Sequence, residues 1–502
     1  MHRTILDERS VDRTSGMQYG CLAGRPDHMT TPEGAMTTTE FDVGSLRGTI
    51  TGAVSLPGDP AYDAAVAIWN GVIERRPAVV ASCRTGDDVA AALSFARGAG
   101  LEVSVRGGGH GYAGLALADG GLMIDLSPMK SVRVDPDARR AQCGGGVTWG
   151  ELDAATQEHG LAVPGGFIST TGIAGLCLGG GFGWLSRLAG LTSDNLIGAE
   201  VVTADGTILR ASESENDELF WALRGGGGNF GAVTSFEFRL HQVGPLVHLG
   251  AFFYAPEQGG DVFRFAREYV RTLPDECGAF LAGLTAPPEP FVPDEQKGQP
   301  VYLLAIVGLA DDAAHGQLVA PVRDAVAPLF ELVTPIPYVA LQQMFNGSAP
   351  WGLLAYEKAV YLDELTDGAI EVILEHQPNK QAPLSFLPIF VLGGEFARIQ
   401  DDATAFGGSR SVRYMVNIAV GALEKDHYEA DRQWARDFWS DLVPHAVGVG
   451  SYVNFLTDQE EDRVRSAYGP TKYSRLAELK ARYDPENVFH LNANIRPVAR
   501  RA

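Results

Sequence analysis

Cysteine is scarce in this chain, and basic residues are outnumbered by acidic ones. The 502 residues include five cysteines, Cys21, Cys83, Cys143, Cys177 and Cys277. Their odd number and wide scatter match neither a metal-ligand set nor a disulfide framework. The 40 Lys and Arg residues stand against 62 Asp and Glu residues, for a formal net charge of -22. This balance argues against nucleic acid or an anionic membrane surface as a partner, because both are bound through Lys and Arg.

Long apolar runs are missing as well. The first 40 or so residues mix charge, glycine, proline and threonine, so neither a signal peptide nor a membrane span is visible. We therefore expect a cytoplasmic protein without a membrane partner, with a disordered N-terminal extension over residues 1–45.

Glycine, in contrast, is abundant and gathers in three segments. Residues 104–115 read Ser-Val-Arg-Gly-Gly-Gly-His-Gly-Tyr-Ala-Gly-Leu, and further glycine segments span 164–183 and 224–231. Loops without side chains let backbone N–H groups approach phosphates, so the pattern favours one long phosphate-bearing ligand beside His110. The dinucleotide fingerprint fits poorly, because it needs one glycine turn opening a helix and an acid about 20 residues on. Turns in a β-rich protein are the alternative interpretation.

Several ordered motifs carry a resemblance to a known family. They are Arg-Gly-Gly-Gly-His at 106–110, Gly-Ile-Ala-Gly-Leu-Cys-Leu-Gly-Gly-Gly-Phe-Gly at 172–183, Gly-Leu-Thr-Ser-Asp-Asn at 190–195, Asp-Glu-Leu-Phe-Trp-Ala-Leu-Arg at 217–224 and Tyr-Asp-Pro-Glu-Asn-Val-Phe at 483–489. Together they resemble the FAD-linked oxidases of the berberine bridge enzyme type, which share the vanillyl-alcohol oxidase (PCMH-type) fold. The resemblance runs from about residue 55 to 497.

The resemblance implies an α+β fold, in which a PCMH-type FAD-binding domain of two α/β subdomains carries an inserted antiparallel-sheet substrate domain. After Pro245 the sequence pattern changes to alternating β-type runs and longer helices, and motifs of the family return at Tyr452. We therefore expect the FAD-binding domain over 46–245, the substrate-binding domain over 246–451, and a C-terminal segment, 452–502, that completes the FAD-binding domain.

Local signals predict several elements. Asp87 and Asp88 are expected to cap a helix that ends at 98–100, and a second helix is expected over 149–158. Asp205-Gly206 predicts a hairpin turn. The clearest strands beyond Pro245 are expected at 301–309, 387–392 and 414–420.

The family implies how FAD is held. His110 matches the histidine that bonds covalently to the flavin, and the position of a second, cysteine link holds Ile168, so one bond is expected and Cys177 is interpreted as a packing residue. The remaining expected cofactor contacts are Arg106, Gly107, Gly108, Gly109, Gly111, Ser169, Thr170, Thr171, Gly172, Gly175, Gly179, Val202 and Asn494. No metal is expected.

The resemblance also implies catalysis. Tyr452 matches a tyrosine that acts as a general base in several relatives, and Tyr414 is the next candidate. We expect a flavoprotein oxidase of a small organic substrate, such as a sugar, alcohol, alkaloid or secondary metabolite, with O2 as electron acceptor. A flavin-dependent dehydrogenase with another acceptor, a redox-neutral cyclase or isomerase, and a non-enzymatic binding protein remain as alternatives.

Overall fold

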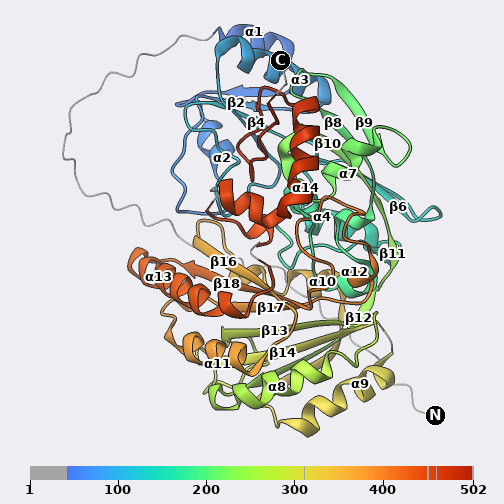
Figure 1. Cartoon of the computed structure of the whole chain (residues 1–502), viewed down its shortest axis with the longest axis vertical. Helices are drawn as coiled ribbons and strands as arrows, with labels where there is room; N and C mark the ends of the chain where they lie inside the picture. The colour runs from blue at the N-terminus through green and yellow to red at the C-terminus, as the bar shows by residue number, and fades with distance from the viewer. Residues whose placement is uncertain (1–41, 310, 449–450, 459–460, 500–502) are drawn as a thin grey trace, which may run out of the picture. The chain divides into compact units, whose positions relative to one another are not determined.

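The computed structural model describes residues 42–499, except 310, 449–450 and 459–460. The expectation of disorder over 1–45 falls mainly outside these residues. Its last part, however, is helical, because α1 spans Val43–Thr49 and buries Leu46. Residues 42–502 form one compact unit, and it contains three large sheets (Figure 1).

The first sheet ends in the glycine loop that carries His110. Its strands, in spatial order, are β1 (Ala53–Ser55), β2 (Val79–Ser82), β4 (Leu122–Asp125) and β3 (Val103–Arg106). Strands β2, β4 and β3 are parallel. Helix α3 (Gly86–Ala99) is capped by Thr85, whose side chain accepts a hydrogen bond from the Asp88 N–H, so the expected cap at Asp87 or Asp88 is wrong. The helix ends, as expected, at Gly100 in the left-handed region.

The second sheet is antiparallel and supports the other glycine loops. Its spatial order is β5 (Val132–Asp135), β6 (Arg140–Gly144), β10 (Ala232–Arg239), β8 (Leu196–Val202) and β9 (Ile208–Ser212). The predicted hairpin joins β8 to β9, and the Asp205 carboxylate accepts hydrogen bonds from Thr203 and Thr207. The sheet's core includes residues of α4 (Trp149–Gln157), α5 (Ile173–Gly179) and α7 (Asp217–Leu223).

The third sheet has seven antiparallel strands. Its order is β15 (Phe330–Pro337), β12 (Leu246–Tyr254), β14 (Pro300–Gly308), β13 (Gly278–Thr285), β17 (Leu387–Val391), β18 (Tyr414–Ala422) and β16 (Leu354–Leu362). The layer of helices on one side comprises α8 (Gly259–Tyr269), α9 (Asp312–Ala325), α11 (Asp367–His376) and α13 (Lys425–Leu442) (Figure 1). Alternate residues supply two cores, one toward these helices and one toward the rest of the chain. The mixture of helices and sheets confirms the predicted α+β class.

The end of the chain returns to the second sheet. Helix α14 (Glu461–Tyr483) lies beside α7, although more than 200 residues separate them in sequence (Figure 1). The fully buried Lys480 ammonium pairs with Asp484 at 2.6 Å and donates to the carbonyl oxygens of Asn229 and Phe489. These bonds tie the C-terminal segment to the glycine loop at 225–231.

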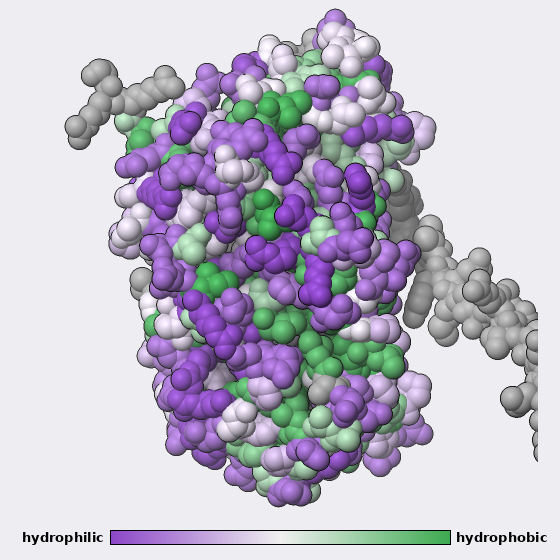
Figure 2. All heavy atoms as spheres, turned by 90° about the vertical axis from the view of Figure 1, so that its right-hand side faces the viewer, coloured by the Kyte–Doolittle hydropathy of each residue, from purple (hydrophilic) through white to green (hydrophobic). Residues whose placement is uncertain are grey.

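The shorter elements connect these layers. They are α2 (Tyr62–Val66), α6 (Ser186–Ala189), α10 (Tyr338–Gln343), α12 (Glu395–Arg398), and β7 (Leu161–Ala162) paired with β11 (His241–Gln242). Hydrophilic residues dominate the molecular face shown in Figure 2, and apolar residues gather in smaller areas among them. Within the described ranges, no helix combines the length and apolar character needed to cross a membrane.

Candidate active site

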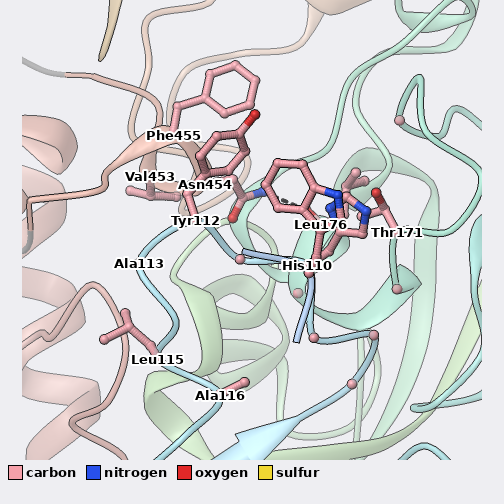
Figure 3. A pocket seen from close by; sticks show the side chains of 18 of the residues that line it. His110, Tyr112, Ala113, Leu115, Ala116, Thr171, Leu176, Val453, Asn454 and Phe455 are labelled. Atoms are coloured by element: carbon pink, nitrogen blue, oxygen red, sulfur yellow. Dashed lines mark hydrogen bonds between the residues drawn. The ribbon is translucent and has the colours of Figure 1, made fainter. Parts of the chain in front are cut away.

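A cavity of about 410 Å³ lies where the glycine loops meet the seven-stranded sheet. Its walls include the loop after β3, the segment around α5, the glycine loop and strand start at 227–233, the strands β13, β17 and β18, parts of the segment 345–353, and the C-terminal segments 452–456 and 489–493. Figure 3 shows side chains from the first, second and last of these parts converging on one space. The volume is in the range of small-molecule sites in proteins.

Two glycine loops form one wall by direct backbone contact. A Cβ on Gly108 would lie 2.4 Å from the Gly172 nitrogen, and a Cβ on Gly172 would lie 2.4 Å from the Gly108 nitrogen. Gly109 has φ +67°, in the region that favours glycine. By contrast, a Cβ on Gly111 or Gly175 would meet nothing within 4 Å, although both residues line the cavity. The two loops therefore pack directly against each other, and they leave free space on the cavity side, next to Gly111 and Gly175.

His110 stands on this wall in a fixed orientation. Its ring stacks on Trp69, with centroids 4.6 Å apart and an interplanar angle of 15°. Its Nε2 lies 3.2 Å from the Thr170 hydroxyl. Burial lowers the pKa of His110 to about 4. The imidazole is therefore neutral at pH 7, and one ring nitrogen keeps a lone pair that can form a bond.

Tyr452 lines the same cavity as the loop after β3. Its phenolic oxygen accepts hydrogen bonds from the Gly181 N–H and the Asn454 amide, each at 2.7 Å. Burial raises the pKa of Tyr452, while both hydrogen bonds act in the opposite direction. Its ring packs against Phe182 and Phe455, with centroids 4.9 and 5.0 Å apart. The phenol is thus held rigidly, with N–H donors directed at its oxygen.

Comparison with known proteins identifies the family. A family model described as an FAD binding domain matches residues 77–212, and one described as berberine and berberine like matches 451–496. An FAD-linked oxidoreductase of Dictyostelium discoideum is 31% identical over 434 residues, which cover 86% of this chain and 91% of that protein. The chain belongs to the FAD-linked oxidoreductases of the berberine bridge enzyme type. The resemblance seen in the sequence is confirmed.

Other relatives of this FAD-linked oxidoreductase match a similar share of the chain. (R)-6-hydroxynicotine oxidase of Paenarthrobacter nicotinovorans is 31% identical over 463 residues, 89% of this chain and 97% of the relative. The crystal structure of 6-hydroxy-D-nicotine oxidase from Arthrobacter nicotinovorans has a TM-score of 0.78 at 28% identity, covering 89% of this chain and 98% of that one. BBE-like 1 of Physcomitrella patens has a TM-score of 0.81 at 22% identity over 91% and 100% of the chains, a likeness of fold alone. The chain is therefore an oxidoreductase enzyme that uses FAD.

The cavity brings together many of the residues that were predicted to bind FAD or to act in catalysis. The predicted residues that line it are Gly107, Gly108, Gly109, His110, Gly111, Thr171, Gly172, Gly175 and Tyr452. Thr170 does not line the cavity, but its hydroxyl contacts His110.

Five other predicted cofactor residues are not among the residues that line the cavity. They are Arg106, Ser169, Gly179, Val202 and Asn494. The Arg106 side chain donates to the Ala65 carbonyl, and the Ser169 N–H and hydroxyl are bonded to Asn346. Val202 is buried in the core around α3, while a Cβ on Gly179 would lie 2.1 Å from the Asn454 side-chain oxygen. Asn494 Oδ1 is buried and has no hydrogen-bond partner in the described chain.

Tyr414 is wrong as a candidate base. It is 1% exposed and packs in the core between the seven-stranded sheet and its helices, whereas Asn417, Ala419 and Gly421 of the same strand line the cavity. Because successive strand residues point to opposite faces, Tyr414 is directed away from the site.

Two cavity features were not expected from the sequence. Asn417 lines the cavity and pairs with Glu357 of β16, which is 1% exposed. A lone acid within the apolar strand Leu354–Leu362 is the sequence signal that could have revealed this pair. The second feature is a group of phenylalanines on the sheet side of the cavity.

Ile168 and Cys177 lie in different surroundings. Ile168 lines the cavity, whereas Cys177 is fully buried in the core of the second sheet. Burial raises the pKa of the Cys177 thiol, which keeps it protonated.

Proposed function

We propose that this protein is an oxidase that transfers a hydride from a C–H bond of a small organic substrate to FAD held covalently at His110, with O2 as the final electron acceptor. The observation that carries the proposal is that His110, in its loop of glycines, and Tyr452, with two N–H donors on its oxygen, line the same cavity.

The cavity wall fits FAD. The space in front of Gly111 and Gly175 accepts a ligand where a side chain would otherwise stand, and backbone N–H groups of such loops suit a pyrophosphate. Asn494 Oδ1, buried and without a partner among the described residues, supports a ligand near the C-terminal segment. When bound, FAD supplies the two-electron acceptor. The neutral His110 ring would hold FAD by one covalent bond. We expect no second bond through a cysteine, because Ile168 occupies the position of that cysteine and has no thiol.

Tyr452 would take up the proton of an alcohol substrate as hydride leaves the neighbouring carbon. The Gly181 and Asn454 N–H groups stabilise the phenolate form and so favour the deprotonated tyrosine that must be present before it can accept a proton, whereas burial favours the neutral phenol. We further propose that residues 46–245 and 452–502 bind FAD, while 246–451 supply the substrate side of the cavity through the seven-stranded sheet.

Dehydrogenase and redox-neutral activities are the remaining alternatives. One structural neighbour is described as a glucose dehydrogenase, and others as xylooligosaccharide and chitooligosaccharide oxidases. These neighbours are 21% identical to this chain, so they inform its fold and leave its acceptor open. An oxidase consumes one O2 for each substrate oxidised, whereas a dehydrogenase is reoxidised slowly by air and a cyclase or isomerase uses no stoichiometric O2.

The test is made on the purified full-length protein. We expect a yellow protein whose flavin stays in the pellet after acid precipitation, and O2 uptake with formation of hydrogen peroxide in a substrate screen. His110→Ala should bind FAD that acid releases, whereas His159→Ala, an exposed histidine after α4, should retain covalent flavin. Release of all flavin from the unmodified protein would contradict the covalent link. Rapid turnover with a dye acceptor but not with O2 would instead identify a dehydrogenase.

A further inference from the structure

The His110 ring contacts two tryptophans that come from different parts of the chain. Trp69 stacks on the ring, with centroids 4.6 Å apart and an interplanar angle of 15°. Trp351, which is 46% exposed, approaches edge-on at 6.4 Å and 81°. The Thr170 hydroxyl lies 3.2 Å from Nε2. The stack fixes the plane of the imidazole, and the hydroxyl favours the ring flip that places Nε2 beside it.

Trp69 is itself held where three segments meet. Its backbone N–H donates to the carbonyl of Gly109, the residue before His110, at 2.9 Å. Its indole N–H donates to the Ala349 carbonyl at 2.9 Å, and its own carbonyl accepts from the Gly352 N–H at 3.0 Å. The residue is 1% exposed. Because the indole is closely packed and its N–H is satisfied, the surface on which His110 stacks is rigid.

A strap formed by residues 346–353 completes this arrangement. It begins with η4 (Asn346–Ser348) and ends just before β16. The Asn346 side chain accepts from the Ser169 N–H at 3.0 Å and donates to the Ser169 hydroxyl at 2.8 Å. Further along, the strap makes the two hydrogen bonds to Trp69. It therefore ties together the two segments whose side chains orient the His110 ring.

Covalent attachment of FAD is the step for which this orientation matters. A ring nitrogen of His110 bonds to the 8α methyl carbon of the flavin, while the imidazole N–H proton and one proton of that carbon are lost. The electron pair passes into the isoalloxazine ring and then, with two protons, to O2, which becomes hydrogen peroxide. Burial lowers the pKa of His110 to about 4, so the ring is neutral and has one lone pair to direct. Misplacement of a reacting group by 1 Å can cost about 10²-fold in rate.

We propose that Trp69 and Thr170 are positioning residues, which hold the His110 imidazole in the orientation that covalent attachment of FAD requires, and that the strap fixes Trp69 in place. This assignment rests on the proposed covalent flavoprotein function and adds how the bond is prepared. Both residues act through the His110 ring. Attachment then depends on docking of residues 346–353, so the bond forms only after distant parts of the chain have folded together.

The rate of attachment in the full-length protein tests this assignment. Protein from riboflavin-limited cells is mixed with FAD, and acid-stable flavin is measured over time. The same variants combined with His110→Ala form no bond, so fluorescence titration of these gives the affinity for FAD. Trp69→Leu should slow attachment at least tenfold while the affinity changes less than about threefold. Trp69→Phe keeps an aromatic face for stacking and should attach FAD within about threefold of the unmodified rate.

Matched variants separate the stack from other effects. Trp351→Leu makes the same change beside the same ring but removes an edge contact, so it should slow attachment less than about threefold. An equal loss in Trp351→Leu and Trp69→Leu would overturn the role of the stack. Thr170→Val removes a hydroxyl at an exposed position and should slow attachment about three- to tenfold, which provides a second test if Trp69→Leu does not fold.

Thermal melting shows whether each variant is folded. An unchanged rate in folded Trp69→Leu or in Thr170→Val contradicts the role of that residue. Absence of acid-stable flavin from the unmodified protein would instead contradict the proposed covalent link, so the two proposals fail by different results.

Discussion

The Asn454 side-chain amide donates a 2.7 Å hydrogen bond to the phenolic oxygen of Tyr452, two residues before it in the chain. The Gly181 N–H donates a second bond to the same oxygen. Two donors on one oxygen stabilise negative charge there, and this is the property that a phenol needs to act as a base. The two bonds also connect the C-terminal segment to the turn after α5, so the position of the base depends on contacts between distant parts of the chain.

Replacement of Tyr452 tests its role as base. Tyr452→Phe keeps the packing ring and removes the proton acceptor, so with an alcohol substrate the rate of flavin reduction should fall by about 10²- to 10⁴-fold while substrate affinity changes little. Stopped-flow absorbance measures this rate. Tyr414→Phe, on the helix side of β18, is the matched control and should leave the rate unchanged. A loss of less than about threefold with an alcohol would exclude Tyr452 as the base.

The prediction of Tyr414 as a candidate base shows what the sequence alone could not indicate, namely the face of the sheet on which a residue lies. Every residue of β18 is buried, because the sheet has helices on one side and the cavity and its surrounding core on the other. Hydropathy therefore does not alternate along this strand, and nothing local indicates which face Tyr414 occupies. The Glu357–Asn417 pair was missed for a related reason: it joins residues 60 positions apart, whose pairing depends on the order of strands in the sheet.

Several features set by short-range rules were predicted correctly, although the N-cap of α3 was not. The β8–β9 hairpin follows from Asp205-Gly206, and the end of α3 follows from Gly100, because each depends on a few neighbouring residues. The glycine loop around His110 was also predicted, since its composition directly limits its backbone. Val202 and Ser169 do not line the cavity, since Val202 is buried in the core around α3 and the Ser169 N–H is bonded to Asn346, so their contact with FAD stays a prediction. Motif spacing locates a segment without fixing which of its groups are already bonded within the protein.

The contact between Gly108 and Gly172 predicts that FAD binding depends on the lack of a side chain at either position. Gly172→Ala would put a Cβ 2.4 Å from the Gly108 nitrogen and separate the two loops. Overpacking of this kind costs about 1–3 kcal/mol, so flavin content should fall to roughly a tenth or less. The ratio of flavin to protein absorbance measures this. Gly98→Ala on α3, where a Cβ meets nothing within 4 Å, should keep full flavin content; equal content in both variants would contradict the prediction.

The positions of Ile168 and Cys177 predict a single flavin attachment. After proteolysis, mass spectrometry should find the flavin on the peptide that contains His110 and on no other. Cys177→Ala should leave the amount of covalent flavin unchanged, because this thiol is buried in the core away from the cavity. A flavin-modified Cys177 peptide would show that the assignment of Ile168 to the second-link position is incorrect.

Asp153 predicts a dependence of stability on pH that is independent of the flavin chemistry. Its carboxylate, on α4, accepts a hydrogen bond from Gln342 of α10 through Oδ2, while Oδ1 and Gln342 Oε1 have no partner within the described chain. Burial raises the pKa of Asp153 from 3.8 to about 7. Between these values the unfolded chain has lost the proton that the folded protein keeps, so stability falls as pH rises through this window.

Asp153→Asn removes this titration and supplies an amide N–H that can donate to Gln342 Oε1. Relative to the unmodified protein, the variant should therefore gain more stability at pH 8 than at pH 5, up to about 4 kcal/mol in total from a shift of roughly three pKa units. Thermal melting at both pH values measures the difference, which should appear as a Tm increase of about 2 °C or more at pH 8. Asp137→Asn, an exposed residue in the turn after β5, is the control and should give no pH-dependent change. A Tm increase of the same size at pH 5 and pH 8 would show that the Asp153 carboxyl titrates normally in the folded protein.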